Sequence, residues 1–259
     1  MNSLLGGHNY GTFGTMVVVG SKFQPQCCIA DIKQYAIRSS RNPLPTTTAT
    51  SYNVTMSDNT PPEINSEANR YNTMGIAQAN QNMNIQAIAS FSKAIELDPE
   101  NPGFWYNRGI IYASDNSLPL AIQDFTRALE LRGDDADILN NRGSVYAMLG
   151  EYDSAITDLS LCIELNPNQP EPYNTRAAVL AQKGEYVAAI VDFSRAIGIK
   201  PQYAEAHFNL ARVNSLMGRC DLASAHLKEA MSLQPAYKQV ARATGDFSAC
   251  IGKPEFTAL

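Results

Sequence analysis

Apolar and polar positions follow a helical period along most of the chain, and this period is interrupted at regular intervals. From residue 68 to residue 237, apolar residues recur three and four positions apart in paired stretches. Each pair contains an internal break that carries glycine or asparagine, the residues that most readily end a helix. These breaks lie at Asn82, Asn116, Gly150, Gly184 and Gly218. The pattern predicts a series of helix–turn–helix units.

The units repeat with a fixed length. Pro99, Pro167, Pro201 and Pro235 lie 68, 34 and 34 residues apart, and Gly133 fills the missing place. Two columns of small residues keep the same period: Ala87, Ala121, Ala155, Ala189 and Ala223 form one, and Ala94, Ala128, Cys162, Ala196 and Ala230 form the other. Small side chains at fixed positions predict close contacts between helices.

Large residues complete a recognisable signature. The motif residues are Trp105, Gly109, Tyr112, Ala121, Phe125 and Ala128 in one unit, and Leu139, Gly143, Tyr146, Gly150, Tyr152, Ala155 and Pro167 in the next. Through these residues the chain resembles the tetratricopeptide repeat family from residue 68 to residue 237. The units are 68 to 101, 102 to 135, 136 to 169, 170 to 203 and 204 to 237. The resemblance implies an all-α, right-handed α-solenoid of five 34-residue repeats.

The segment before the repeats has a different composition. Residues 1 to 67 are rich in Gly, Asn, Ser and Thr and show no sustained period, so we expect them to be mostly disordered. Asp31 is the only acidic residue before Asp58, and four basic residues accompany it: Lys22, Lys33, Arg38 and Arg41. Residues 1 to 57 therefore resemble an organellar transit peptide, although a convincing cleavage site is missing. The alternatives are a flexible cytosolic arm and a true start at Met56, so we expect a cytoplasmic protein, with an organellar location as the alternative.

The segment after the repeats predicts a cap. In residues 238 to 259, Val240, Ala243, Phe247 and Ile251 follow a helical spacing that Gly245 interrupts. A repeat array needs a terminal element that covers its last apolar face. We therefore expect an amphipathic capping helix from Lys238 to Ile251, followed by a tail.

Composition and charge narrow the class of partner. The net charge is −5 and the pI about 5.2, so the chain lacks the basic surface that gathers phosphates, and nucleic acid is not an expected partner. The five cysteines are scattered and odd in number, which favours reduced thiols. The longest apolar candidate for a membrane span, Met16 to Val19, is far too short.

The motifs of common enzymes and metal sites are missing from the sequence. There is no H-E-x-x-H and no G-x-S-x-G. Gly252 and Lys253 approach a phosphate-binding loop, but Phe247 replaces its first glycine and Pro254 its Ser or Thr. His207, His226 and Cys220 share one unit, where packing and surface roles are favoured over metal binding. We expect no enzyme activity, no catalytic residue, no metal and no cofactor.

Three units carry an arginine and an aspartate sixteen residues apart on opposite helices. The pairs are Arg108 with Asp124, Arg142 with Asp158, and Arg176 with Asp192. Both members change together in the outer units, to Met74 with Ser90 and to Leu210 with His226. This covariation within one chain predicts an ion pair inside each unit that fixes helix orientation. If exposed, such a pair is worth about 0 to 1 kcal/mol; the alternative is a stripe of arginines that binds anions.

In the tetratricopeptide repeat family the first helix of each unit lines a concave groove. The resemblance implies that two positions of each first helix, which form two columns along the repeats, face this groove. They hold Asn72, Tyr106, Asn140, Asn174 and Phe208 in one, and Thr73, Asn107, Asn141, Thr175 and Asn209 in the other. An amide can donate to and accept from a peptide backbone. The predicted partner-binding residues are Asn72, Tyr106, Asn107, Asn140, Asn141, Asn174, Phe208, Asn209 and Arg212. The alternative is that asparagine is only tolerated at the surface.

The family's carboxylate clamp for heat-shock proteins has no counterpart here. The matching columns hold Asn and Thr, Arg212 is the only base, and Asp137, Glu171 and Glu205 along the rim would repel a terminal carboxylate. We therefore expect a protein or peptide partner of another kind. The leading hypothesis is an adaptor or assembly factor that binds a partner segment in the groove, and the alternative is a permanent structural subunit of a larger complex.

Overall fold

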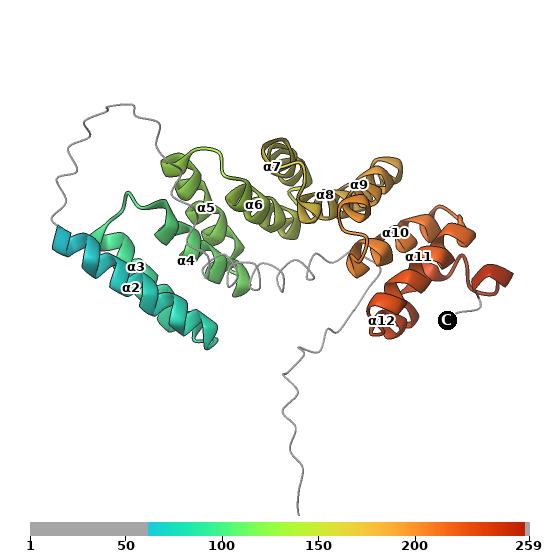
Figure 1. The fold of residues 1–259 in the computed structure, drawn as a ribbon, viewed down its shortest axis with the longest axis horizontal. Helices are drawn as coiled ribbons and strands as arrows, with labels where there is room; N and C mark the ends of the chain where they lie inside the picture. Colours follow the sequence, from blue (N-terminus) through green and yellow to red (C-terminus); the bar gives the residue numbers. More distant parts are fainter. Residues whose placement is uncertain (1–61, 257–259) are drawn as a thin grey trace, which may run out of the picture.

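The structure is a computed structural model that describes residues 62 to 256. Within these residues the regular elements are helices, with no strand, which confirms the all-α prediction. Eleven α-helices follow one another along the chain (Figure 1): α2 (Pro62–Asn80), α3 (Asn84–Leu97), α4 (Pro102–Ser114), α5 (Leu118–Arg132), α6 (Ala136–Leu149), α7 (Tyr152–Leu165), α8 (Pro170–Gln182), α9 (Tyr186–Ile199), α10 (Ala204–Leu216), α11 (Cys220–Leu233) and α12 (Tyr237–Ala243). Two short 3-10 turns follow, η1 (Gly245–Phe247) and η2 (Pro254–Phe256). No helix in this range is long and apolar enough to cross a membrane.

The helices pack in five pairs, from α2 with α3 to α10 with α11, as the repeat pattern predicts. The turn inside each pair depends on one residue with a positive φ. Gly150 ends α6 at φ 80°, and the next amide, of Glu151, donates to the carbonyl of Tyr146 at 2.9 Å. A left-handed residue after a helix lets the chain reverse while it satisfies the last carbonyls. Asn82 and Asn116 adopt φ of 59° and 60° at the equivalent places, which confirms the predicted breaks.

Small residues allow the two helices of a unit to touch. Every alanine in the column of Ala155 is fully buried. Opposite Ala155, a Cβ added to Gly143 would lie 2.9 Å from Cγ of Leu159 and 3.3 Å from the carbonyl oxygen of Ala155. These distances are shorter than ordinary van der Waals contact, so the helices approach as closely as their backbones permit.

The row of units is curved. The first helices are α2, α4, α6, α8 and α10, and each of the first four contacts the first helix of the next unit, whereas second helices make no comparable contact with one another in the described residues. Closer spacing on one side bends the row toward that side, and Figure 1 shows the helix pairs arranged along an arc. The first helices therefore line its inner side, which we call the first-helix face.

The N-terminal boundary differs from the sequence prediction. Helix α2 begins at Pro62, six residues before the expected start at residue 68. Proline fits the first turn of a helix, where its missing N–H is not needed. The helix thus starts upstream of the repeat frame, in a stretch where no periodic contact is required. The predictions for residues 1 to 61, disorder and a transit peptide, lie outside the described residues.

The C-terminal cap exists, but its helix is shorter than predicted. Helix α12 ends at Ala243, because Thr244 is extended and Gly245 begins a separate 3-10 turn. Phe247 is fully buried, whereas Ile251, which was expected on the same apolar side, is exposed. Only the first part of the predicted helix therefore forms.

The prediction that the thiols are reduced is wrong for two of the cysteines. Cys220 and Cys250 form a disulfide between residues 30 positions apart. Their proximity could not be read from the sequence because it depends on how the cap folds back. Cys162 is a free thiol whose pKa is raised to about 12, mainly because it is buried. Cys27 and Cys28 lie outside the described residues.

Candidate partner-binding face

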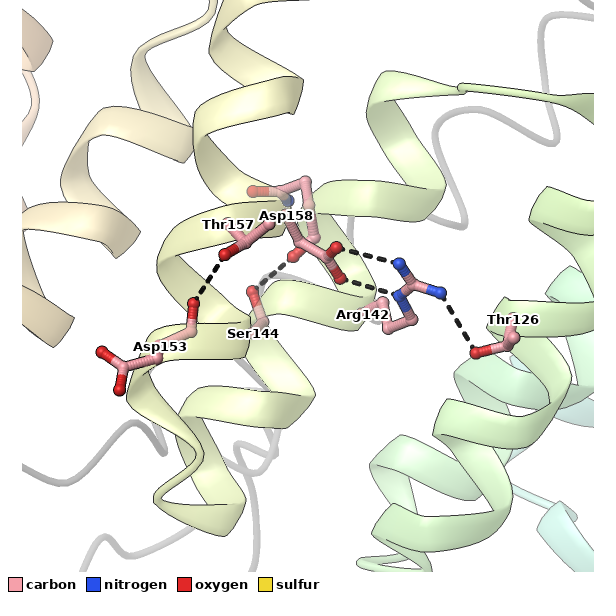
Figure 2. Close-up of polar contacts among 7 residues, drawn as sticks. Thr126, Arg142, Ser144, Asp153, Thr157 and Asp158 are labelled. Atoms are coloured by element: carbon pink, nitrogen blue, oxygen red, sulfur yellow. Dashed lines mark hydrogen bonds and ion pairs between the residues drawn. The ribbon is translucent and has the colours of Figure 1, made fainter.

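The three predicted ion pairs form inside their units. In the third unit, Nε and Nη2 of Arg142 donate to the two carboxylate oxygens of Asp158 at 2.7 and 2.9 Å (Figure 2). Arg108 with Asp124 and Arg176 with Asp192 have the same two-bond geometry. The aspartates are buried and the arginines largely so, which makes these pairs parts of the scaffold rather than an exposed stripe for anions.

Each arginine also reaches the preceding unit. Nη1 of Arg142 donates to the hydroxyl of Thr126 on α5 at 3.1 Å, as Figure 2 shows. The equivalent bonds run from Arg108 to Ser92 at 2.9 Å and from Arg176 to Ser160 at 3.0 Å. This contact was not predicted, although the hydroxyl residues recur in the sequence with the 34-residue period. The guanidinium therefore joins two units as well as two helices.

In the last unit a histidine pair takes the place of the ion pair. Nδ1 of His207 lies 3.1 Å from Nδ1 of His226, and Nε2 of His207 lies 3.0 Å from the carbonyl oxygen of Pro201. Because the carbonyl can only accept, His207 carries its proton on Nε2 and accepts a hydrogen bond from His226 at Nδ1. Burial, and then the neighbouring His207, lower the pKa of His226. From residue 62 to residue 256, no group of three or more metal-ligating side chains comes together.

The predicted asparagine columns hold the units to one another. The amide of Asn107 donates to Oδ1 of Asn72 at 2.9 Å, and that of Asn141 donates to the hydroxyl of Tyr106 at 2.9 Å. Asn209 donates to Asn174 at 3.4 Å in the same way. Each bond runs from one first helix back to the preceding one. The structure therefore gives these amides a role that sequence analysis did not foresee.

Burial divides the nine predicted partner-binding residues into two groups. Asn72, Tyr106, Asn107, Asn140 and Arg212 are partly exposed, whereas Asn141, Asn174, Phe208 and Asn209 are buried. The expectation of an exposed side chain is thus not met for the second group. Phe208 packs among the cap residues, and Nε of Arg212 donates to Oδ2 of Asp246 at 2.7 Å. Partner binding by these nine residues stays a prediction.

Asn140 differs from the other amides of the face. Its Oδ1 atom is buried, and it has no hydrogen-bond partner among the described residues. A buried acceptor without a partner costs about 1 to 3 kcal/mol. Asn84 and Asn214 also have a buried Oδ1 atom without a partner in the described residues, and Asn140 is the one of the three that belongs to the predicted partner-binding residues.

The edge of the face is acidic over three successive units. Asp137, Glu171 and Glu205 stand in the first turns of α6, α8 and α10. Nζ of Lys200 approaches Glu171 only to 3.9 Å, and Glu205 accepts from the amide of Asn174 at 3.2 Å. Carboxylates at helix N-termini are stabilised by the helix dipole. The edge thus carries negative charge over three successive units.

Three family models match the chain, and all of them describe the same repeat. A family model described as "Tetratricopeptide repeat" matches residues 136–169, a second with the same description matches 204–237, and one described as "TPR repeat" matches 75–116, 109–150 and 177–218. Two of these matches coincide with the third and fifth units of the sequence analysis. No curated protein matches the chain in a sequence search.

Solved structures with the same fold come from several proteins. YrrB, described as a TPR protein with an unusual peptide-binding site, is 25% identical, has a TM-score of 0.57, and aligns over 70% of this chain and 94% of its own. PilW, described as a widely conserved type IV pilus biogenesis factor, is 23% identical with a TM-score of 0.61 over 71% and 88%. MamA from Desulfovibrio magneticus RS-1 is 18% identical with a TM-score of 0.62 over 66% and 96%. The last two likenesses concern the fold alone.

Proposed function

Because the chain belongs to the tetratricopeptide repeat family, we propose that it is an adaptor or assembly factor that binds a segment of a partner protein on the first-helix face and catalyses no reaction. Repeat proteins of this family generally mediate protein–protein interactions. The peptide-binding site named for YrrB supports a peptide-like partner for an array of this kind. Fold alone would not carry the proposal.

The observation that supports this proposal most directly is that Oδ1 of Asn140 has no hydrogen-bond partner in the described residues. The neighbouring amides already bond across the units, so they hold adjacent first helices in a fixed arrangement. Among the nine predicted residues, only Asn140 has a buried acceptor without a hydrogen-bond partner in the described residues. Groups fixed before binding lose little conformational freedom when a partner arrives. Because this oxygen is buried, the side chain of Asn140 must turn outward to accept one backbone N–H from an extended partner segment, while the bonds between neighbouring first helices stay in place.

Two adjacent asparagines test this proposal with opposite expectations. Asn140→Leu removes the unmatched acceptor, so it should leave stability unchanged or raise it, and should weaken partner binding about three- to tenfold. Asn141→Leu removes the bond to Tyr106, so it should lower stability by about 0.5 to 1.5 kcal/mol. The partner is first identified by affinity purification and mass spectrometry, and its affinity is then measured by calorimetry. Wild-type affinity of Asn140→Leu would refute the proposal.

A second candidate function is that of a permanent structural subunit. Val187 and Val191 stand one turn apart on α9, with 67% and 63% of their surface exposed. Two exposed apolar side chains on a second helix favour a fixed contact on the outer side of the array. Co-purification at constant stoichiometry that survives Asn140→Leu but is lost in Val187→Ser with Val191→Ser would favour this alternative.

A further inference from the structure

We propose that the disulfide between Cys220 and Cys250 is a thiol–disulfide exchange site, and that a dithiol reductant opens it to release the C-terminal cap from the last unit. The cap is the segment from residue 237 to residue 256, which contains α12, η1 and η2. The disulfide joins the first residue of α11 to the stretch that follows η1. In addition to the backbone, this disulfide links the cap covalently to the array.

The cap covers an apolar surface that would otherwise be open to water. Phe208 on α10 stacks on Tyr237 at a ring distance of 4.5 Å and meets Phe247 edge-on at 5.8 Å. Phe247 is fully buried and contacts Phe256 at 5.6 Å. In the inner units the next first helix covers the equivalent surface. The cap therefore substitutes for a sixth unit.

The cap holds little structure of its own. Helix α12 has seven residues, and isolated helices shorter than about 12 residues are marginal in water. Besides the ring contacts, the cap is attached to the last unit by the ion pair of Arg212 with Asp246, by the disulfide and by the packing of cap residues in the apolar cluster of α10 and α11. A short segment that is held by a single neighbouring unit can open locally while the rest of a protein stays folded. Loss of the covalent link should therefore free the cap without unfolding the array.

The two sulfur atoms differ in a way that sets the direction of exchange. Cys250 is fully buried, whereas Cys220 is slightly exposed and stands between the exposed residues Arg219 and Asp221. Of the two cysteines, Cys220 is therefore the one more open to an incoming thiolate. The hydroxyl of Ser215 donates to Sγ of Cys250 at 3.4 Å, which stabilises the thiolate that leaves. A better stabilised leaving thiolate departs faster.

The exchange balances with one dithiol. Its first thiolate bonds to Sγ of Cys220, the bond between the two cysteines breaks, and Sγ of Cys250 leaves with the electron pair and takes up a proton. The second thiolate of the reductant then attacks the reductant's first sulfur in the mixed disulfide. Sγ of Cys220 leaves with the electron pair and is also protonated. The cysteine pair is reduced to two thiols and the dithiol is oxidised to a cyclic disulfide.

Release changes the end of the first-helix face. Phe208 loses the rings of the cap, and Arg212 loses the carboxylate of Asp246. Both residues belong to the predicted partner-binding set, so the oxidised protein closes the last unit and the reduced protein opens it. This step rests on the proposed function, whereas the opening of the cap does not.

Hydrogen exchange of the full chain tests the opening. The variant Cys27→Ser, Cys28→Ser, Cys162→Ala retains only the pair in question, and alanine at position 162 is what the other four units carry in that column. Blocking of free thiols in the oxidised variant should label neither Cys220 nor Cys250. Dithiothreitol should then speed amide exchange about tenfold or more in residues 237 to 250, with α4 to α9 unchanged. Oxidised glutathione should restore protection.

Three results would overturn the proposal. The first is labelling of both cysteines before reduction, the second is unchanged exchange after reduction, and the third is loss of protection throughout the array. The variant Cys220→Ser with Cys250→Ser lacks the disulfide, so without any reductant it should show the amide exchange of the reduced protein. None of these measurements needs a partner. Failure of the Asn140→Leu test would thus leave this result standing, and the reverse also holds.

Discussion

The guanidinium of Arg142 and the carboxylate of Asp158 form a two-bond ion pair that is nearly removed from water. Their side chains keep 18% and 8% of their surface exposed, and the same guanidinium donates to Thr126 of the preceding unit. A pair at this depth differs from the exposed pair that the sequence suggested. Its members depend on each other, because either one alone would be left buried and uncompensated.

This dependence predicts a strong non-additivity. Asp158→Ser should destabilise the protein by about 3 to 5 kcal/mol, because it leaves the arginine without its carboxylate. Arg142→Met with Asp158→Ser installs the residues that the first unit carries as Met74 and Ser90, so the double variant should be more stable than Asp158→Ser alone. Urea unfolding of the two single variants and the double variant measures the coupling. Additive changes would show that the pair does not act as a unit.

The alanine columns predict sensitivity to added volume. Ala155 is fully buried between the helices of its unit, so Ala155→Leu should destabilise the protein by about 1 to 3 kcal/mol or more. Ala188 on α9 is exposed, and Ala188→Leu should change stability by less than about 0.5 kcal/mol. Thermal unfolding compares the two. Equal midpoints would mean that the column of Ala155 is not a helix contact.

Two glycines on helices predict effects of opposite sign. Gly143→Ala would place a Cβ 2.9 Å from Leu159, which should cost about 1 to 3 kcal/mol despite the better helix propensity of alanine. A Cβ on Gly198 in α9 meets nothing within 4 Å, so Gly198→Ala should stabilise the protein by about 0.4 to 1 kcal/mol. Denaturant midpoints measured side by side decide the matter. A loss of stability at both positions would contradict the packing described for α6 and α7.

The half-buried His226 of the last unit predicts a dependence on pH. The pKa of His226 is lowered from 6.5 by burial and by His207, while Glu229 opposes the shift. On acidification, His226 of the unfolded chain binds a proton before His226 of the folded chain does. The contribution of His226 to the free energy of unfolding is therefore complete above about pH 6.5 and is lost as the pH falls through the lowered pKa. His226→Gln should flatten the fall in unfolding free energy between about pH 7.5 and 5.5. A fall of the same size in the variant would assign the effect to other groups.

Periodicity made the fold predictable because each unit repeats the same contacts. Gly150, Asn82 and Asn116 could be read as helix ends since a left-handed residue is needed there and few residue types adopt it. The pairs of Arg142 and its counterparts could be read because both members change together. Their third bond, to Thr126 and its counterparts, could have been found from the period of the hydroxyl column alone.

The remaining features depend on contacts that no period describes. The disulfide of Cys220 with Cys250 forms only because the chain turns back after Thr244, and no second copy of this turn exists in the sequence to reveal it. The role of Asn141 depends on the distance between neighbouring first helices, which places its amide beside Tyr106. A column of asparagines looks the same in a sequence whether it meets a partner or the preceding unit.

The line of arginine bonds between units stops before the last one, and this gives the molecule a mechanical asymmetry. Leu210 stands where an arginine would reach Ser194, whose hydroxyl instead bonds to the carbonyl of Ile190 in its own helix. Arginine bonds thus connect units one to four in series, while the fifth is joined to the fourth by packing and by hydrogen bonds of Asn174 with Asn209 and Glu205. When the molecule is pulled from its two ends, the contact between α9 and α10 should therefore separate first, while the first four units stay together.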